Sequence, residues 1–281
     1  MKSPCILCGS DKHSLIFSKD QWKIYKCDLC GLGVLNPQPG KDELTALYQN
    51  EYFQSHYDNE LLSDSTEMRK RLTQETHRIR FFRKFKKKGK ILDIGCGRGY
   101  FLLACREKGY DVEGIDISSD AAAYVKKELN IPVHTGEVGN IELPDKIYDV
   151  ITMWHSLEHT NDPNLYIQNA CKWLKDEGIL VIDVPNYTGY DAQKRRDEWQ
   201  GWSIPYYFYH FTKDALFTLL KNHGFSIISD KHYLSEYVKQ KLEGFFMPSF
   251  AARIIARFYS GHSVAVVAKK NYRHFKTSSH I

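Results

Sequence analysis

The sequence predicts an α/β protein with a doubly wound, mostly parallel sheet and a small cysteine-rich unit at its N-terminus. Three observations predict this fold class. Short apolar runs alternate with helical stretches from Lys90 onwards, a glycine-rich loop follows the first of these runs, and two C-x-x-C pairs lie near the N-terminus. Strands that alternate with helices are typical of parallel sheets covered by helices.

The composition fits an ordinary globular protein. Of the 281 residues, 42% are hydrophobic and 26% are charged, which excludes a disordered chain, and only 18 glycines exclude a collagen-like fibre. No apolar run approaches the roughly 20 residues that span a bilayer. The first residues lack the apolar core of a signal peptide. We therefore expect a cytoplasmic protein without a transmembrane segment.

Residues 1–40 are predicted to form a zinc-ribbon-like unit. Their two C-x-x-C pairs are separated by 18 residues, a spacing typical of sites that bind zinc through four cysteines. A glycine follows each pair, at Gly9 and Gly31, and suits the positive φ that such turns need. A metal-free loop or a redox-active pair are the alternatives. The predicted ligands of a structural zinc ion are Cys5, Cys8, Cys27 and Cys30.

Residues 41–89 are predicted to form a helical cap or linker. Apolar residues recur near helical spacing over residues 60–88, which predicts one long amphipathic helix. Eleven Lys and Arg residues and a single acid, Glu75, lie between Arg69 and Lys90. The charges are expected to form a solvated face of the cap or to attract an anionic substrate or surface.

Residues 90–281 are predicted to form the main domain. Strands are expected in the apolar or β-branched runs, with a helix over Pro163–Lys175 between two of them. The segment 187–211 is a predicted aromatic lid, and 233–262 is a predicted helical insert that forms core, a cap over a site or a membrane-touching face. The expected strands are 90–94, 110–116, 131–137, 148–154, 178–184, 225–230 and 263–269.

The glycine loop carries the clearest chemical signal. The strand ending at Ile94 runs into Gly95-x-Gly97-x-Gly99, where a helix is expected to begin. Glycine lets the backbone pass close to a ligand, and a helix N-terminus favours a negative group. The dinucleotide fingerprint requires a third glycine at position 100, but this residue is Tyr100, which weakens a NAD interpretation.

An acid ends the next predicted strand. Asp116 lies 23 residues after Asp93, and a carboxylate there can accept hydrogen bonds from both ribose hydroxyls of an adenosine. Each acid also has a structural interpretation, Asp93 as a loop cap and Asp116 as the N-cap of a helix. The combination of strand, glycine loop, helix, strand and acid favours a nucleotide site on a Rossmann-like sheet.

These segments resemble the class I S-adenosylmethionine-dependent methyltransferases. The resemblance rests on L-D-I-G-C-G-R-G, G-I-D-I-S and Y-D-V-I-T-M-W-H-S-L-E-H, and covers roughly Lys90 to Val184. It implies S-adenosylmethionine as cofactor, with its methionine portion near Asp93 and the loop glycines and its ribose on Asp116. It also implies that Trp154 and His155 face the reacting methyl group. The residues implied to contact or border the adenine are Ile117, Glu137 and Val138.

The N-terminal cysteines, N-P-Q-P, H-x-x-E-H-x-x-D-P and H-F-T add a narrower likeness. Together they are similar to zinc-carrying methyltransferases of deoxysugar and cell-surface carbohydrate pathways. This resemblance implies a small-molecule acceptor, such as a nucleotide-linked sugar, and no particular oligomeric state. An RNA base methyltransferase and a non-catalytic cofactor-binding scaffold are the alternatives.

A methyl acceptor must lose a proton, and histidine suits that role near neutral pH. The resemblance to sugar C-methyltransferases favours His210 as the base. The predicted lid supports an acceptor site, because nine of its 25 residues are aromatic, and Arg195 and Arg196 suit a phosphate. The other candidates, each with a structural role as the alternative, are His155, Glu158 and His159.

Overall fold

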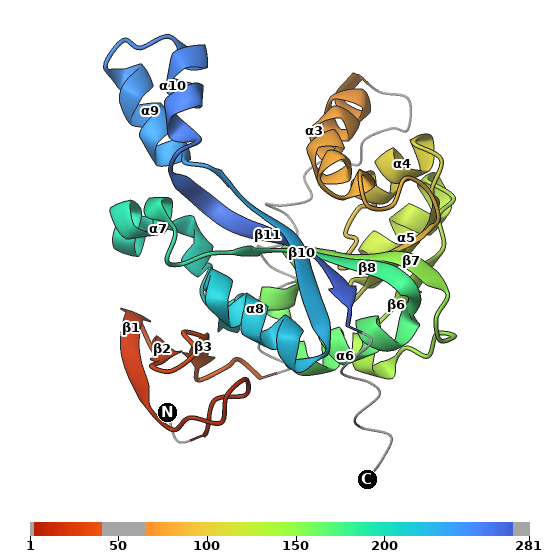
Figure 1. Ribbon diagram of the computed structural model, residues 1–281, viewed down its shortest axis with the longest axis horizontal. Helices are drawn as coiled ribbons and strands as arrows, with labels where there is room; N and C mark the ends of the chain where they lie inside the picture. The colour runs from red at the N-terminus through yellow and green to blue at the C-terminus, as the bar shows by residue number, and fades with distance from the viewer. Residues whose placement is uncertain (1–2, 41–65, 272–281) are drawn as a thin grey trace. The chain divides into compact units, whose positions relative to one another are not determined.

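The computed structural model describes residues 3–40 and 66–271 (Figure 1). These residues divide into two compact units. The cysteine-cluster unit contains the described residues up to Gln38, together with Leu157–Asn164 and those from Ile182 onwards. The glycine-loop unit contains the described residues between Pro39 and Ser156, together with Leu165–Val181.

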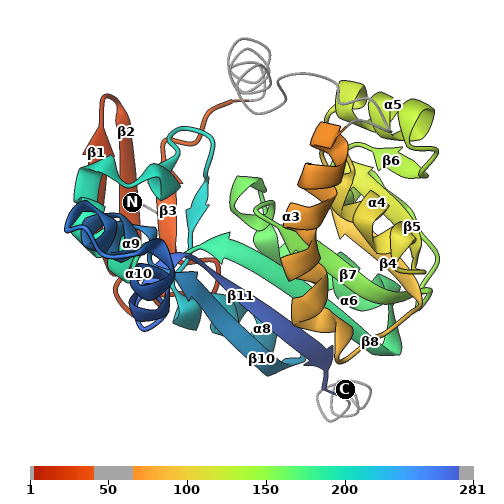
Figure 2. The same cartoon turned by 90° about the horizontal axis from the view of Figure 1, so that it is seen from above.

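Strands and helices alternate through the middle of the chain, as the sequence predicts. The described elements from β1 to β8 are β1 (His13–Lys19), β2 (Trp22–Cys27), β3 (Gly33–Asn36), α3 (Thr66–Arg83), β4 (Lys90–Ile94), α4 (Tyr100–Glu107), β5 (Asp111–Asp116), α5 (Ser119–Glu128), β6 (Val133–Thr135), η2 (Val138–Asn140), β7 (Tyr148–Trp154), η3 (Leu157–His159), α6 (Pro163–Trp173) and β8 (Leu174–Pro185). Figure 2 shows α3 beside α4 within the glycine-loop unit.

The remaining elements belong to the cysteine-cluster unit. They are α7 (Tyr190–Arg195), η4 (Arg196–Glu198), η5 (Gln200–Trp202), β9 (Tyr209–His210), α8 (Lys213–Asn222), β10 (Phe225–Leu234), α9 (Glu236–Gly244), α10 (Ser249–Ala256) and β11 (Ser260–Lys270). In Figure 1, α9 and α10 lie at one end of the long β10 and β11 strands.

The main sheet has seven strands in the order β10-β11-β8-β7-β4-β5-β6. Strand β4 pairs in parallel with β5 and β7, and β5 pairs in parallel with β6, whereas β10 and β11 are antiparallel. The predicted fold class is confirmed. The central strands are near-continuous apolar runs, such as Ile179–Ile182, because helices cover both faces of a parallel sheet.

A second sheet, in the order β1-β2-β3-β9, joins distant parts of the sequence. Gly33 and Val34 of β3 pair with His210 and Tyr209 of β9. The N-terminal strands therefore group with residues from Ile182 onwards, and the boundary at residue 40 remains a prediction.

The predicted helix over residues 60–88 is too long at its C-terminal end. The structure ends α3 at Arg83, where Phe85 N–H bonds to the carbonyl of Phe82 in a turn. Three consecutive lysines and Gly89 follow, and like charges and glycine both disfavour a helix. Residues 60–65, and residues 41–65 of the predicted cap as a whole, lie outside the described residues. Within the described ranges, no helix is long and apolar enough to cross a bilayer.

Candidate active site

The glycine loop connects β4 to α4. Gly95, Gly97 and Gly99 all have positive φ, at 80°, 51° and 71°. The amides of Gly95 and Cys96 both donate to the carbonyl of Ile115, at 2.8 and 3.0 Å, which ties the loop to the end of β5. Only glycine adopts such a succession of left-handed conformations at little cost.

Asp116 bridges this loop and the start of α5. Its Oδ2 accepts from Gly97 N–H at 2.6 Å and its Oδ1 from Ser118 N–H at 2.9 Å. Burial raises the pKa of Asp116, and the hydrogen bonds from Ser118 and Gly97 oppose that rise. The N-cap of α5 is Ser118, whose Oγ accepts from Ala121 N–H at 3.1 Å, so Asp116 is not the helix cap.

The residues predicted to contact adenine differ in exposure. Ile117 is a large apolar side chain that remains 62% exposed directly after Asp116. Glu137 is half-buried at the start of η2, and the side chain of Val138 is buried. An exposed isoleucine beside the ribose-binding candidate suits a planar base, whereas Val138 could border it only through its backbone. These roles remain predictions.

Asp93 is buried on β4, two residues before the first glycine of the loop. Its Oδ1 accepts from the hydroxyl of Thr152 at 2.5 Å. Burial raises the pKa of Asp93 to about 7, while the Thr152 hydroxyl and the Arg78 guanidinium lower it and Glu75 raises it further. A carboxyl group held at this pKa can be ionised by an approaching cation.

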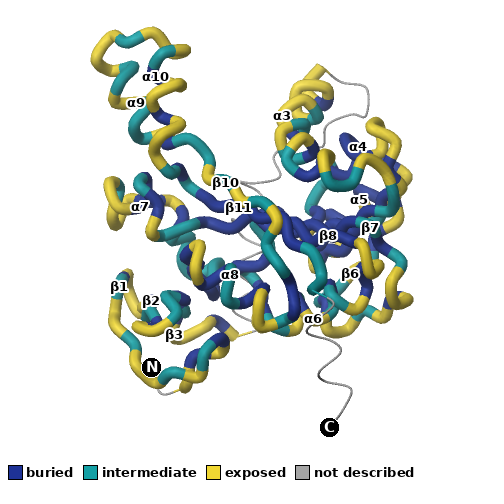
Figure 3. The backbone as a smooth tube through the Cα atoms, viewed as in Figure 1, coloured by how far each residue is buried: buried dark blue, intermediate teal, exposed yellow. Residues whose placement is uncertain are grey.

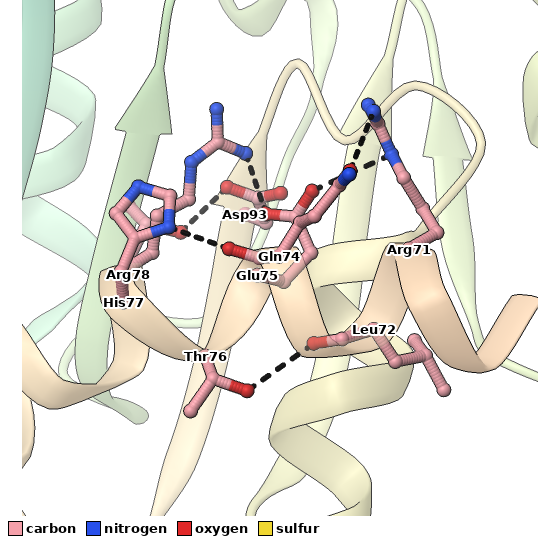
Figure 4. Close-up of polar contacts among 9 residues, drawn as sticks. Arg71, Leu72, Gln74, Glu75, Thr76, His77, Arg78 and Asp93 are labelled. Carbon is pink, nitrogen blue, oxygen red and sulfur yellow. Dashed lines mark hydrogen bonds and ion pairs between the residues drawn. The ribbon is translucent and has the colours of Figure 1, made fainter. Parts of the chain in front are cut away.

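Helix α3 places a charged cluster beside Asp93 (Figure 4). Glu75 is buried and accepts from Arg78 at 2.8 Å, and Arg71 lies 3.7 Å from the same carboxylate. The Arg78 guanidinium stands 5.2 Å from the ring centre of Trp154. Among the described residues, Arg78 Nε and Trp154 Nε1 are buried without a hydrogen-bond partner. Orphaned donors beside a titratable carboxyl group fit a ligand with both acidic and basic groups, such as an amino acid.

Sequence reasoning missed Glu75 and Arg78 as site residues. It assigned the basic charges of this helix to a solvated face or an anion-attracting one, yet Arg78 pairs with a buried acid. The available signal was Glu75 itself, the only acid between Arg69 and Lys90. Acids are seldom buried unless they are paired, and the neighbouring arginines supply that pairing here.

Gly95→Ala is expected to weaken cofactor binding by about tenfold or more, because a 1 Å shift of a binding loop is enough to misplace its amides. A Cβ at this position would meet Ser156 Cβ at 2.6 Å and Oγ at 2.8 Å, so the loop must move. Isothermal titration with S-adenosylhomocysteine measures the loss.

Gly109→Ala is the matched control for this loop variant. Gly109 has a similar φ of 86°, but its added Cβ would meet nothing within 4 Å. Both variants should lose about 1 kcal/mol of stability from backbone strain, Gly95→Ala should lose more because of its clash with Ser156, and only Gly95→Ala should lose affinity. Equal affinities for the two variants would contradict a close approach of ligand to this loop.

Cofactor affinity is expected to fall below pH 7, by up to about tenfold per pH unit, because only ionised Asp93 attracts the cofactor's ammonium group. The folded pKa of about 7 lies above the ordinary 3.8. Asp93 therefore stabilises the unliganded fold at low pH, and this contribution is lost as the pH rises through 7. Titrations with S-adenosylhomocysteine at a series of pH values measure the affinity.

The control for this pH dependence is an exposed aspartate on the neighbouring strand. Asp93→Asn should weaken binding and flatten the profile, whereas Asp111→Asn should leave both unchanged. A flat profile for the wild-type protein would exclude Asp93 as the titrating partner of the ligand.

The four predicted metal-binding cysteines form one cluster. Their sulfur atoms all lie within 4.8 Å of one another, with Cys5 and Cys30 at 3.4 Å and Cys8 and Cys27 at 3.5 Å. A tetrahedron with zinc–sulfur bonds of about 2.3 Å has sulfur atoms slightly under 4 Å apart, so the cluster has the size that zinc requires.

The backbone around the cysteines favours thiolates. The amides of Gly9 and Gly31 close the turns onto the carbonyls of Cys5 and Cys27, and the positive φ expected at both glycines is confirmed. Burial raises the pKa of Cys27, but backbone amides of Cys30 and Leu29 outweigh it and lower that pKa to about 6. Burial raises the pKa of both the Cys5 and the Cys30 thiol, and it outweighs the backbone amides that lower the pKa there.

His210 lies buried on β9 in the cysteine-cluster unit. Burial lowers its pKa to about 3, although a hydrogen bond to the backbone of Tyr207 raises it slightly. Within the described ranges, Nε2 is buried and has no hydrogen-bond partner. The imidazole is therefore neutral at physiological pH, and its Nε2 faces no hydrogen-bond partner among the described residues.

Aromatic rings of the predicted lid surround His210. Trp202 lies 5.6 Å from the imidazole, measured between ring centres, and stacks on Phe17 of β1 at 4.7 Å. Tyr187 and Trp199 contact the same indole at 6.0 and 5.3 Å. We call Phe17, Tyr187, Trp199 and Trp202 the aromatic cluster. Part of the lid thus packs against the N-terminal sheet.

The three other candidate bases fall in two units. His155 belongs to the glycine-loop unit and has a positive φ of 53°. Glu158 and His159 belong to the cysteine-cluster unit. Glu158 is buried and its carbonyl accepts from Phe208 N–H at 2.8 Å. The His159 ring meets Tyr207 edge-on at 4.7 Å. Glu158 and His159 thus contact Phe208 and Tyr207, which precede β9. Their catalytic roles remain predictions.

The doubly wound sheet and its glycine loop define a nucleotide-binding α/β protein. A family described as "Methyltransferase domain" matches residues 65–230, more than half of the chain. The chain belongs to this methyltransferase family. The fold and the family membership support S-adenosylmethionine as the cofactor.

Curated relatives match over about a third of this chain. A ubiquinone biosynthesis O-methyltransferase from Rickettsia akari is 31% identical over 102 residues, which are 35% of this chain and 41% of that protein. A probable S-adenosylmethionine-dependent methyltransferase from Mycobacterium tuberculosis is 28% identical over 99 residues, or 34% of this chain and 35% of the relative. The matches span less than half of these relatives' lengths.

Solved structures share the fold at low identity. A methyltransferase from Archaeoglobus fulgidus has a TM-score of 0.56 and 21% identity, with 79% of this chain and 100% of that chain covered. The 1,6-didemethyltoxoflavin-N1-methyltransferase of Burkholderia thailandensis has a TM-score of 0.51 and 16% identity, with 92% and 99% covered.

Proposed function

We propose that this protein transfers a methyl group from S-adenosylmethionine to a small-molecule acceptor, with His210 as the general base. The observation that carries the proposal is the buried, neutral imidazole whose Nε2 has no partner among the described residues. A buried polar nitrogen normally has a hydrogen-bond partner. A base that receives its partner only when a ligand binds is one reason for such a nitrogen to lack one.

The cofactor supplies an electrophilic methyl group when it is bound. The residues that would hold it are Asp93, Gly95, Gly97, Gly99, Asp116 and Ile117, with Arg78 and Trp154 beside Asp93. The loop glycines keep the backbone open to a ligand, and Asp116 presents a buried carboxylate suited to ribose hydroxyls. His210 takes the proton that the acceptor loses.

A nucleotide-linked sugar is the acceptor class that the cysteine-cluster unit suits best. The Trp202 indole of the aromatic cluster lies beside His210, and an aromatic ring at this position favours a sugar or a base. Arg195, on α7 of the same unit, bonds to Gln240 at 2.9 Å and is available to exchange this neutral partner for a phosphate. The relatives are named for different acceptors, so the substrate class rests on this unit's own residues.

The cysteine cluster is proposed to bind one structural zinc ion. Its size and its turns support this assignment, and all seven cysteines of the chain are free thiols. Free thiols in this number also suit the reducing conditions of the cytoplasm, which is the proposed location.

A turnover screen tests the proposed function. It follows S-adenosylhomocysteine release with pooled nucleotide sugars and then with structured RNA, comparing the wild-type protein with His210→Ala and with His232→Ala, an exposed histidine on β10. Release with a sugar nucleotide that only His210→Ala loses supports the proposal. Release only with RNA would overturn the acceptor class, and binding of cofactor without release from any pool would favour a scaffold.

A further inference from the structure

The α9–α10 hairpin, residues 236–259, carries an unusual apolar surface. Phe245, Phe246, Phe250 and Phe258 are 81%, 98%, 72% and 82% exposed, and they are the only exposed phenylalanines in the described part of the chain. Figure 3 shows α9 in the intermediate and exposed colours and α10 mostly in the exposed colour. Single exposed apolar residues are ordinary, but a contiguous group marks an interaction surface.

The spacing of α10 turns this surface outward. Phe250 and Ile254 lie four residues apart on one face of α10, and Phe258 follows in the turn after the helix. Together with Phe245 and Phe246 they form what we call the phenylalanine face. Ala252 and Ala256 are buried on the opposite side, and α9 packs against α10. Small residues of α10 are therefore buried, whereas the phenylalanine face is left exposed.

The base of the hairpin is anchored. Asp191 of α7 accepts from the Ser235 hydroxyl and, at 3.1 Å, from the amide of Glu236. Ser235 caps α9 through Val238 N–H at 3.0 Å, and its own amide donates to the carbonyl of Ala256 at 3.1 Å. These bonds fix both helices, so the phenylalanine face is a built feature of the unit.

Positive charge accompanies this face. Arg253 is exposed on α10, and Arg257 is exposed at the C-cap of this helix. Each directly precedes a member of the face, Ile254 or Phe258, and neither has an ion-pair partner within the described ranges. No Asp or Glu occurs in residues 244–259. A second copy of the chain docked symmetrically would bring these arginines together, which disfavours self-association. An anionic surface with an apolar layer beneath it complements both the arginines and the phenylalanines.

We propose that the α9–α10 hairpin docks this protein onto an anionic lipid bilayer, with the phenylalanine face inserted between headgroups and the arginines at the phosphates. A helix with aromatic residues on one side and cations beside them lies in the plane of the interface. Basic residues add attraction to anionic leaflets, and this part of the binding is screened by salt. The inference is independent of the acceptor.

Vesicle co-sedimentation of the full-length protein tests the docking surface. The probes are vesicles of phosphatidylglycerol mixed with phosphatidylcholine, and vesicles of phosphatidylcholine alone. The variant F246S/F250S/F258S removes exposed side chains only, and its fold is checked by circular dichroism and S-adenosylhomocysteine binding. L15S/I228S, at exposed apolar residues outside the hairpin, is the matched control.

The wild-type protein and the control are expected to sediment with the mixed vesicles. The affinity of the triple serine variant for the mixed vesicles should be lower by about tenfold or more. R253Q/R257Q should lose the part of the binding that salt weakens. Wild-type protein that stays in the supernatant, or a triple variant that sediments equally well, would overturn the proposal. So would light scattering that shows a dimer dispersed by the triple variant without any vesicle binding.

Discussion

Replacing His210 with alanine is expected to reduce kcat by about 10²- to 10⁴-fold, the usual contribution of a general base. The affinity for S-adenosylhomocysteine should stay unchanged, because the cofactor-binding candidates belong to the glycine-loop unit and His210 to the other. The physical reason for the loss is the unpartnered Nε2, since alanine offers the acceptor no nitrogen to take its proton. Steady-state kinetics with the acceptor found by the screen measure the effect.

Chemical rescue separates a base from a packing residue at this position. Added imidazole should restore part of the activity of His210→Ala, because the cavity left by the side chain lies beside the aromatic cluster and can admit a small ring. His223→Ala is the matched control, since His223 is also partly buried in this unit and burial lowers its pKa too. Loss of activity in both variants, without rescue of either, would assign His210 to packing alone.

The order of strands and the glycine loop could be predicted because the signals are local. The run K-I-L-D-I became β4 with the expected bounds, and the loop glycines adopt the positive φ for which only glycine is suited. Asp116 likewise lies at the end of β5, where its spacing from the loop placed it. Each of these inferences needs only a few neighbouring residues.

The missing parts depend on contacts between distant residues. Glu75 and Arg78 reach Asp93 only because α3 packs onto the glycine-loop unit, and nothing in the spacing of α3 says which charges turn inward. The pairing of Gly33 with His210 joins two segments that are far apart in the sequence. The apolar period of α10 was visible in sequence, but periodicity does not tell a buried face from an exposed one.

Cys27→Ser is expected to remove the metal and unfold the N-terminal sheet. Structural zinc contributes about 10 kcal/mol or more to small domains, far beyond what the few buried side chains of β1–β3 supply. The wild-type protein should contain one zinc ion per chain by elemental analysis, and the variant almost none. Because Trp202 stacks on Phe17 at 4.7 Å, its fluorescence should change as β1 is lost.

The consequence should extend from the cysteines to His210. Strand β9 pairs with β3, so loss of the N-terminal sheet removes Gly33, the strand partner of His210. It also removes Phe17, which stacks on Trp202 in the aromatic cluster. Turnover should therefore fall together with the zinc content, while cofactor affinity, carried by the glycine-loop unit, is retained. Cys171→Ser, a partly buried cysteine outside the cluster, should keep zinc, fluorescence and turnover. A Cys27→Ser protein that loses zinc yet keeps full turnover would show that the N-terminal sheet does not position His210, and the coupling between the two sites would have to be abandoned.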